Sequence, residues 1–233
     1  MNFFFLQAQN MADTLVKTAA PTTVAPQEMH LIDLLMKAGW IMIPLLILSI
    51  ATIYFFAERW MAIKKASSVD ENFMNIIRDN ILSGNVTAAR NFAKNASHPV
   101  GRMIDKGLQR IGKPIDAINS SMENVAQLEL FKLEKNINIL SVVSKVAPIF
   151  GFVGTLVGLM QLFYNINATG EYELSTIAGG IYTKLISSIT GLVIGMMAYL
   201  LHNILQAQVD KTANLIESAA ADFLDVLQEP TRS

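Results

Sequence analysis

Hydrophobic residues are gathered along this chain into three long runs, with mixed segments before, between and after them. The runs cover residues 39–58, 139–166 and 176–201. About 20 apolar residues in a helix span the hydrocarbon core of a bilayer, so each run predicts a transmembrane helix. In the first run, Trp40 and Trp60 lie ~30 Å apart at 1.5 Å per residue, which matches the two aromatic belts of a membrane-spanning helix.

The segments beside the first run predict helices outside the hydrocarbon. Residues 28–38 predict an amphipathic helix at the membrane interface, because apolar residues recur there at helical spacing. These residues are Leu31, Leu34, Leu35 and Ala38. Residues 59–138 predict several helices, separated by glycines and prolines. Neither residue type occurs between Pro114 and Pro148, so we expect one continuous helix to lead from this region into the second run.

Three further segments complete the predicted organisation. Residues 1–27 contain much Thr, Ala and Pro and predict a mobile tail, and residues 167–175 predict a short polar connection. In residues 202–233 apolar positions recur every three or four residues among charged ones. This pattern predicts a helix that continues the third run and ends near Pro230.

Basic residues predict the orientation in the membrane. The segment 61–138 holds eleven Lys and Arg residues, whereas the connection 167–175 holds none. Because cytoplasmic loops carry the excess of Lys and Arg, we expect the region 59–138 and the C-terminal segment in the cytoplasm. The predicted fold is an all-α integral membrane protein with three transmembrane helices, its N-terminus outside and its C-terminus inside.

Composition agrees with a membrane protein and narrows the chemistry. Hydrophobic residues make up 52% and charged residues 16% of the 233 positions, and the mean hydropathy is +0.38. There is no cysteine, which excludes disulfides and thiolate sites. The three histidines are scattered, so no metal site or other cofactor is predicted. A net charge of -1 gives no reason to expect nucleic acid as a partner.

Small residues form one helical face of the second run and continue in the third. Within a bilayer such faces let helix backbones approach closely, because lipid supplies little hydrophobic force between helices. We therefore predict a helix-packing role for this set. Its members are Ala147, Pro148, Gly151, Gly154, Gly158, Gly191 and Gly195.

The third run also carries a face of hydroxyl groups. Thr183, Ser187 and Thr190 fall at i, i+4 and i+7, with Ser188 beside them, and Thr155 lies next to the glycine face of the second run. These hydroxyls either line an ion path or bond back to carbonyls one turn earlier. Neither run contains Asp or Glu, so this chain alone lacks the usual proton acceptor of a membrane channel.

Lys184 lies inside the third apolar run, where a charge is costly. One interpretation is that its side chain extends outward to Glu171 or Glu173 in the connection. The other is that it faces a wet interior or pairs with a carboxylate of a partner.

Several short stretches carry a family pattern. They are Gly-Trp-Ile-Met-Ile-Pro at the start of the first run, His98-Pro99-Val100, Leu133-Glu134-Lys135-Asn136-Ile137, Ala147-Pro148 through Gly158, and Gly180-Ile181 through Gly191-Leu192. Together they resemble the ExbB/TolQ/MotA proton-channel family. Three predicted spans are similar to ExbB or TolQ, whereas MotA carries four.

The resemblance implies a bacterial inner-membrane protein that forms a homo-oligomeric ring, a pentamer in the family. Its second and third spans would line a pore occupied by helices of an ExbD- or TolR-like single-span partner, which supplies an essential Asp. Proton flow would do work on a periplasm-spanning partner such as TonB. By this resemblance Thr155 and Ser188 match pore hydroxyl positions, and Lys184, Ser187 and Thr190 lie beside them. At Thr183 many ExbB proteins carry a glutamate, which is absent here.

The leading hypothesis is thus an ExbB-like subunit that energises TonB-dependent outer-membrane transport, with a TolQ-like role in envelope integrity as the alternative. A non-conducting scaffold would use the same small-residue faces for packing only. An enzyme is not expected, because the second and third runs contain no acid and the spans offer no nucleophile–base pair or set of metal ligands.

Overall fold

The computed structural model describes residues 39–170 and 174–228, and every regular element within them is an α-helix. The predicted tail 1–27, the predicted interfacial helix 28–38, residues 171–173 of the connection and the last five residues lie outside the described parts. The helices are α3 (Met42–Ala66), α4 (Phe73–Leu82), α5 (Val86–Asn95), α6 (Pro99–Leu108), α7 (Ile115–Glu134), α8 (Ile137–Thr169) and α9 (Leu174–Gln228).

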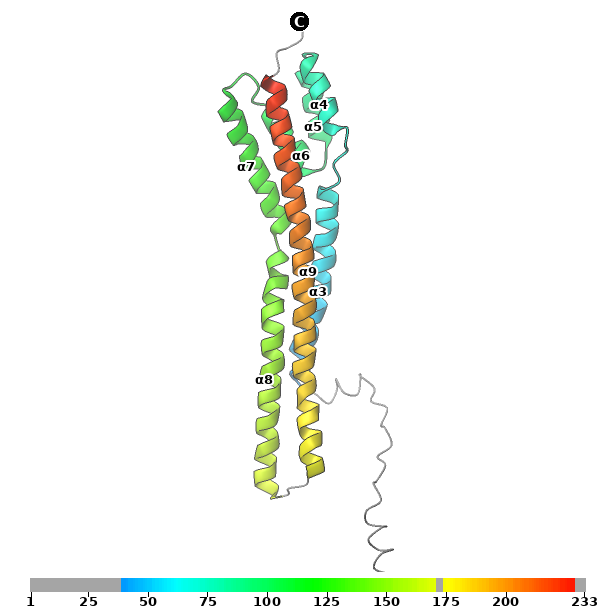
Figure 1. Cartoon of the computed structure of the whole chain (residues 1–233), viewed down its shortest axis with the longest axis vertical. Helices are drawn as coiled ribbons and strands as arrows, with labels where there is room; N and C mark the ends of the chain where they lie inside the picture. The colour runs from blue at the N-terminus through cyan, green and yellow to red at the C-terminus, as the bar shows by residue number, and fades with distance from the viewer. Residues whose placement is uncertain (1–38, 171–173, 229–233) are drawn as a thin grey trace, which may run out of the picture. The chain divides into compact units, whose positions relative to one another are not determined.

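Three stretches of the described residues are long and apolar enough to cross a membrane. They are Met42–Ala66, Ile115–Thr169 and Ile177–Gln228. The prediction of an all-helical chain with three long apolar helices is therefore confirmed. The third of these helices is much longer than a membrane span needs, since α9 continues without a break to Gln228 (Figure 1).

α8 and α9 lie side by side and share the largest helix–helix contact, and α3 packs against both. Buried apolar side chains hold the three together in two clusters. One cluster surrounds Leu45, Val143, Ala147 and Ala198. The other contains Ile63, Ala66, Leu133, Ile137, Leu140, Leu205 and Val209.

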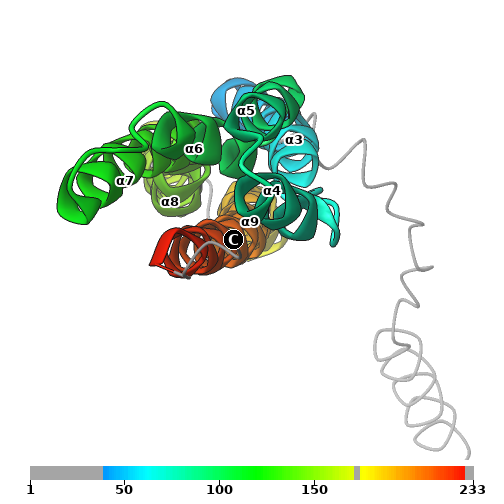
Figure 2. The ribbon, with the colours of Figure 1, turned by 90° about the horizontal axis from the view of Figure 1, so that it is seen from above.

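α4, α6 and α7 pack against α9, and α5 packs against α4 and α6 (Figure 2). Their shared core is the largest buried cluster of the described residues, and Phe223 at its centre is fully buried. The cluster is Phe73, Ile77, Ile81, Ala89, Ala93, Val100, Met103, Ile104, Leu108, Ile118, Met122, Ile216, Ala219, Phe223 and Val226. α9 thus joins an apolar hairpin to a soluble-type core.

The prediction of one continuous helix from Pro114 into the second run is wrong. α7 ends at Glu134, Lys135 is extended, and Asn136 has φ +68°, in the left-handed region, before α8 begins at Ile137. Asn enters this region more readily than most residues, so the chain turns here without glycine or proline. The Nη1 of Arg59, from α3, donates to the carbonyl of Lys132 at 3.4 Å, which pairs one of the carbonyls left free where α7 ends.

Candidate functional site

The glycine face of α8 lies against α9 of the same chain. A methyl group placed on Gly151 would sit 2.7 Å from the carbonyl oxygen of Ser187 and 3.1 Å from the Cα of Gly191. A methyl on Gly191 would in turn sit 2.5 Å from the carbonyl oxygen of Ala147. The two backbones therefore touch directly at this level, and only glycine fits on either side.

The contact extends in both directions along the hairpin. Toward α8's start, Gly195 faces the ring of Pro148, whose Cγ and Cδ would lie 2.6 Å from an added methyl. Toward its end, Gly154 faces the hydroxyl of Ser187, and Gly158 faces the aliphatic stem of Lys184. We call this contact, from Gly195 and Pro148 to Lys184 and Gly158, the glycine seam.

Thr155 is the polar group that α8 places in the seam. It is 7% exposed, and its Oγ1 donates to the carbonyl of Lys184 on α9 at 3.1 Å, with Gly151 of its own helix at 3.3 Å as a second acceptor. Because the proton is used in these bonds, the oxygen keeps its acceptor capacity for a further donor.

The hydroxyls of α9 bond to their own helix. Thr183 donates to Gly179 at 2.7 Å, Ser187 to Lys184 at 2.9 Å and Thr190 to Ile186 at 2.8 Å. Ser187 is buried, whereas Thr183, Ser188 and Thr190 are partly exposed. Each bonded hydroxyl is a donor that retains acceptor capacity, so back-bonding does not prevent these groups from meeting a donor on another molecule.

Lys184 lies partly buried in the seam, with its Cγ and Cε within 3 Å of where a methyl on Gly158 would sit. The absence of a side chain at Gly158 makes room for this stem. Lys184 forms no ion pair with a carboxylate among the residues that the structure describes. Glu171 and Glu173, its predicted outward partners, lie outside those residues.

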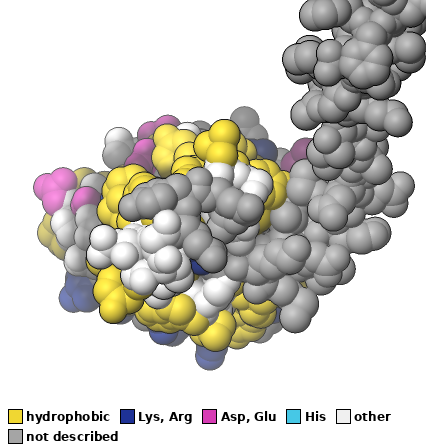
Figure 3. Space-filling view, turned by 90° about the horizontal axis from the view of Figure 1, so that it is seen from below, with side chains coloured by type: hydrophobic (Ala, Val, Ile, Leu, Met, Phe, Trp, Pro, Cys, Tyr) yellow, Lys and Arg dark blue, Asp and Glu magenta, His cyan; other side chains and the backbone are white. Residues whose placement is uncertain are grey.

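The hairpin of α8 and α9 carries no acidic residue across the bilayer-length part of its sequence. None occurs between Glu134 and Glu171 or between Glu173 and Asp210. Seen from below, from the end where α8 stops and α9 starts, the described side chains in view are mainly hydrophobic or uncharged polar, and most charged ones lie at the margin (Figure 3). Over residues 39–170 and 174–228, no group of three or more His, Asp or Glu residues is arranged so that it could hold a metal ion.

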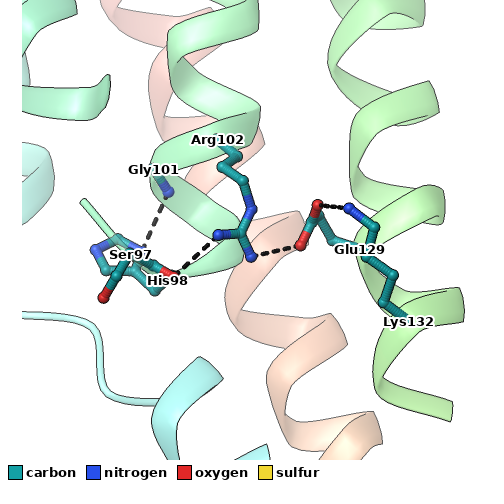
Figure 4. A network of polar contacts seen from close by, with 6 residues as sticks. All are labelled: Ser97, His98, Gly101, Arg102, Glu129 and Lys132. Atoms are coloured by element: carbon teal, nitrogen blue, oxygen red, sulfur yellow. Dashed lines mark hydrogen bonds and ion pairs between the residues drawn. The ribbon is translucent and has the colours of Figure 1, made fainter. Parts of the chain in front are cut away.

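A polar network outside the apolar hairpin was not predicted from the sequence. Glu129 of α7 is 5% exposed, yet it accepts from Arg102 of α6 at 2.5 Å and from Lys132 at 2.7 Å (Figure 4). Burial alone would raise the pKa of the Glu129 carboxyl, but the hydrogen bonds and charges of Lys132 and Arg102 hold it below the ordinary value of 4.5. The spacing of Glu129 and Lys132 is the only sequence signal for this network.

The start of α6 adjoins the same network, because Arg102 donates to the carbonyl of Ser97 at 3.0 Å and the next residue, His98, caps the helix. The Nδ1 of His98 accepts from the amide of Gly101 at 3.1 Å, and Pro99 occupies the first helical position. Its ring meets Phe73 edge to face at 4.8 Å. Burial, together with the nearby charge of Arg102, lowers the pKa of His98 below its ordinary value of 6.5. The neutral ring is the form that caps, because a protonated Nδ1 cannot accept.

This cap predicts a pH-dependent stability of α6. The pKa of His98 is lowered on folding. The contribution of the neutral His98 cap to the stability of α6 is therefore complete above pH 6.5 and is lost as the pH falls from 6.5 through the folded-state pKa. Loss of a cap costs about 1 kcal/mol, or about a fivefold lower protection factor. Hydrogen exchange of the α6 peptide, corrected for intrinsic rates, should show protection falling toward this limit as the pH is lowered from 7.5 through 6.5 and past the folded-state pKa.

His98→Asn is the matched variant, because asparagine also caps but does not titrate. It should keep α6 protected throughout this pH range. An unchanged pH dependence in this variant would show that another group is responsible.

Comparison with known proteins places the hairpin in a family. The model of the MotA/TolQ/ExbB proton channel family matches residues 95–218, which is more than half of the 233 residues. The chain belongs to the MotA/TolQ/ExbB proton channel family. The matched part runs from the residues before α6 to the C-terminal half of α9, so it includes the whole glycine seam. The family resemblance drawn from the sequence is thus confirmed, and the chain is a membrane protein.

Individual proteins with ExbB or TolQ in their names are also similar to this chain. A putative biopolymer transport protein ExbB-like 1 of Synechocystis is 27% identical over 215 residues, 88% of this chain and 83% of that protein. The Tol-Pal system protein TolQ of Haemophilus influenzae is 31% identical over 97 residues, 42% of this chain and 41% of its own. The biopolymer transport protein ExbB of Helicobacter pylori is 32% identical over 78 residues, 34% of this chain and 54% of its own.

Proposed function

We propose that this chain is the ring-forming, ExbB-like subunit of an inner-membrane motor that uses the proton-motive force to energise TonB-dependent outer-membrane transport. The observation that carries the proposal is the placement of Thr155. Its hydroxyl lies between two apolar helices, bonded to the carbonyl of Lys184, in a hairpin without carboxylates that matches a proton channel family. ExbB-like relatives support the choice within that family.

The missing carboxylate argues for a second polypeptide. A proton crossing a bilayer needs an acceptor of suitable pKa, and hydroxyls do not titrate in the physiological range. We therefore assign the acceptor to an Asp on a single-span, ExbD- or TolR-like protein. When that Asp is protonated it can donate to hydroxyl oxygens, and those of Thr155, Thr183, Ser187, Ser188 and Thr190 keep acceptor capacity.

Lys184 has a related role in this proposal. An ammonium close to the entering carboxylate would favour the charged form of that carboxylate. The open space at Gly158 that receives the Lys184 stem supports the placement of this side chain in the seam.

The outer faces of the apolar helices support assembly into a ring. Large apolar side chains of α8 are more than half exposed in the isolated chain, so lipid or other copies must cover them. They include Ile149, Phe152, Leu156 and Phe163. We propose a homo-oligomer, a pentamer as in the family, with α8 and α9 facing the partner helices.

We assign the topology from the distribution of basic residues. The region 59–138 and the C-terminal segment 202–233 would be cytoplasmic, and the tail 1–27 and the connection 167–175 periplasmic. The bilayer would enclose residues 39–58, 139–166 and 176–201. The soluble-type core around Phe223 would then be the cytoplasmic base of the ring.

A TolQ-like role in envelope integrity is the second candidate, because the matched relatives include a Tol-Pal system protein TolQ. It uses the same hairpin chemistry and differs in the partner that receives the work.

Deletion of the gene separates the two roles. In the deletion strain we expect uptake of a receptor-dependent nutrient to fall by roughly tenfold or more, with no change in resistance to detergent. The wild-type gene should restore uptake. Loss of detergent resistance with normal uptake would assign the TolQ-like role. If neither property changes, the chain is not an energy transducer of either system.

A further inference from the structure

A cavity of about 190 Å³ lies where α3 leaves the predicted bilayer, between α3 and α9. It is lined by Trp60, Ile63, Lys64, Ser67 and Gln208. The first four belong to the last turns of α3 and its C-cap, and Gln208 comes from the cytoplasmic continuation of α9. The cavity is therefore built by two elements that are distant in sequence, which distinguishes it from the surface of a single helix.

The polar groups around this cavity are mostly hydrogen-bond donors without protein partners. The indole N–H of Trp60, the ammonium of Lys64 and the amide N–H groups of Gln208 make no hydrogen bond or ion pair with any residue that the structure describes. Ser67 does have a partner, since its hydroxyl donates to the carbonyl of Lys64 at 3.2 Å. None of the five lining residues is acidic.

The depth of the cavity in the membrane fits the headgroup layer. The hydrocarbon core is about 30 Å thick and the bilayer about 40–45 Å with headgroups, which leaves roughly 5–8 Å of headgroup on each side. Lys64 lies four residues beyond Trp60, or about 6 Å along the helix. With Trp60 at the edge of the hydrocarbon, the ammonium falls at the level of lipid phosphates.

The remaining wall of the cavity is apolar. Ile63 is 2% exposed, and the Trp60 ring, 38% exposed, contacts Phe56 one turn earlier, with ring centroids 5.6 Å apart. Further along α3 toward the bilayer centre, Ile50, Ile53 and Tyr54 are each 60% exposed or more. An apolar surface thus continues from the donors into the membrane, as the chain of a lipid would require.

We propose that this cavity binds the headgroup of an anionic phospholipid of the cytoplasmic leaflet. The phosphate oxygens would accept from Trp60, Lys64 and Gln208, and the acyl chains would lie along the exposed apolar face of α3. A bound lipid would join α3 to α9 just beyond the hydrocarbon. The site is independent of the proton path and of the proposed transport role.

Tryptophan fluorescence provides a direct test, because the chain has only two tryptophans. The full chain carrying Trp40→Phe, which leaves Trp60 as the reporter, is placed in phosphatidylcholine nanodiscs. Brominated phosphatidylglycerol or brominated phosphatidylcholine is then added. We expect the anionic lipid to quench Trp60 at about fivefold lower mole fraction, the effect of one basic side chain near a membrane surface.

Lys64→Gln should abolish this preference, and Gln208→Ala, from the other wall, should reduce it. Lys65→Gln is the matched control, since it removes the same charge from the next residue, which does not line the cavity. Lys64→Arg should retain the preference and shows that the site tolerates substitution.

Three outcomes would overturn the proposal. Equal quenching by the two lipids would show that no anionic site exists. An equal loss in Lys64→Gln and Lys65→Gln would assign the preference to diffuse surface charge. Relief of quenching by inorganic phosphate, in the wild type but not in Lys64→Gln, would identify a soluble phosphate compound as the ligand in place of a lipid.

Discussion

Replacing Gly151 by leucine is expected to separate α8 from α9 and to prevent accumulation of the folded protein. Even a single methyl at this position would lie 2.7 Å from the Ser187 carbonyl oxygen and 3.1 Å from the Cα atoms of Ser188 and Gly191. All three atoms belong to backbone, which cannot rotate away. Overpacking of this kind costs about 1–3 kcal/mol for small insertions, so Gly151→Ala should already lower the thermal stability of the detergent-solubilised protein. Leucine adds three more carbons to the same contact.

The other glycines provide a graded control series. A methyl on Gly158 meets the flexible stem of Lys184, which can move, so Gly158→Ala should be milder than Gly151→Ala. Nothing lies within 4 Å of a methyl on Gly179, so Gly179→Leu should leave stability almost unchanged. Equal losses for Gly151→Leu and Gly179→Leu would show that the glycine seam does not hold the hairpin together.

The seam also limits what these glycines do in an assembly. The sequence predicted a helix-packing role for them. In the structure Gly151, Gly154 and Gly158 face α9 of the same chain, so this face is not available for contact with a second copy. Contacts between copies must then use the outer apolar faces, where Phe152 and Leu156 are exposed.

Much of the fold follows from hydrophobic patterning. Three runs of membrane length predict three long helices, and the periodic apolar residues after the third run predict that α9 continues to near Pro230. These signals are strong because burial in lipid or in a core acts on every residue of a long segment. The predicted hydroxyl positions are likewise visible, since Thr and Ser are conspicuous in an apolar run.

Other features depend on contacts between distant residues, which patterning does not encode. The break at Asn136 needs only one left-handed residue and is fixed by packing and by Arg59 on α3, so no glycine or proline marks it. Glu129 looks like a solvated charge on a helix, and only the approach of Arg102 from α6 shows that it is buried and paired. The helix that the glycine face contacts is likewise decided by tertiary packing, which hydrophobic patterning does not reveal.

Thr155→Val is expected to lower proton flux through the assembled channel by roughly threefold to tenfold. A hydrogen bond between neutral groups contributes about 0.5–1.5 kcal/mol, and each 1.36 kcal/mol changes a rate tenfold. The fold should tolerate the change, because valine is close to threonine in shape and the Lys184 carbonyl still accepts from Ser187 at 2.9 Å. Thr155→Ser keeps the hydroxyl and should retain most of the flux.

Thr52→Val is the matched control for this substitution. Thr52 is also a buried threonine of a membrane-length helix, 4% exposed, and bonds back to Leu48 at 2.8 Å, but it lies on α3 outside the seam. Its replacement should leave flux near the wild-type level. A similar loss in Thr52→Val and Thr155→Val would indicate a general packing effect.

We propose that this chain forms half of a proton path whose acceptor belongs to another polypeptide. The most direct test is proton flux, measured with a pH-sensitive dye inside liposomes, for the chain alone and for the chain with a co-purified single-span protein carrying an Asp. We expect no flux from the chain alone, flux from the complex, and loss of that flux when the partner's Asp is changed to Asn. Proton flux through the chain alone would contradict this proposal.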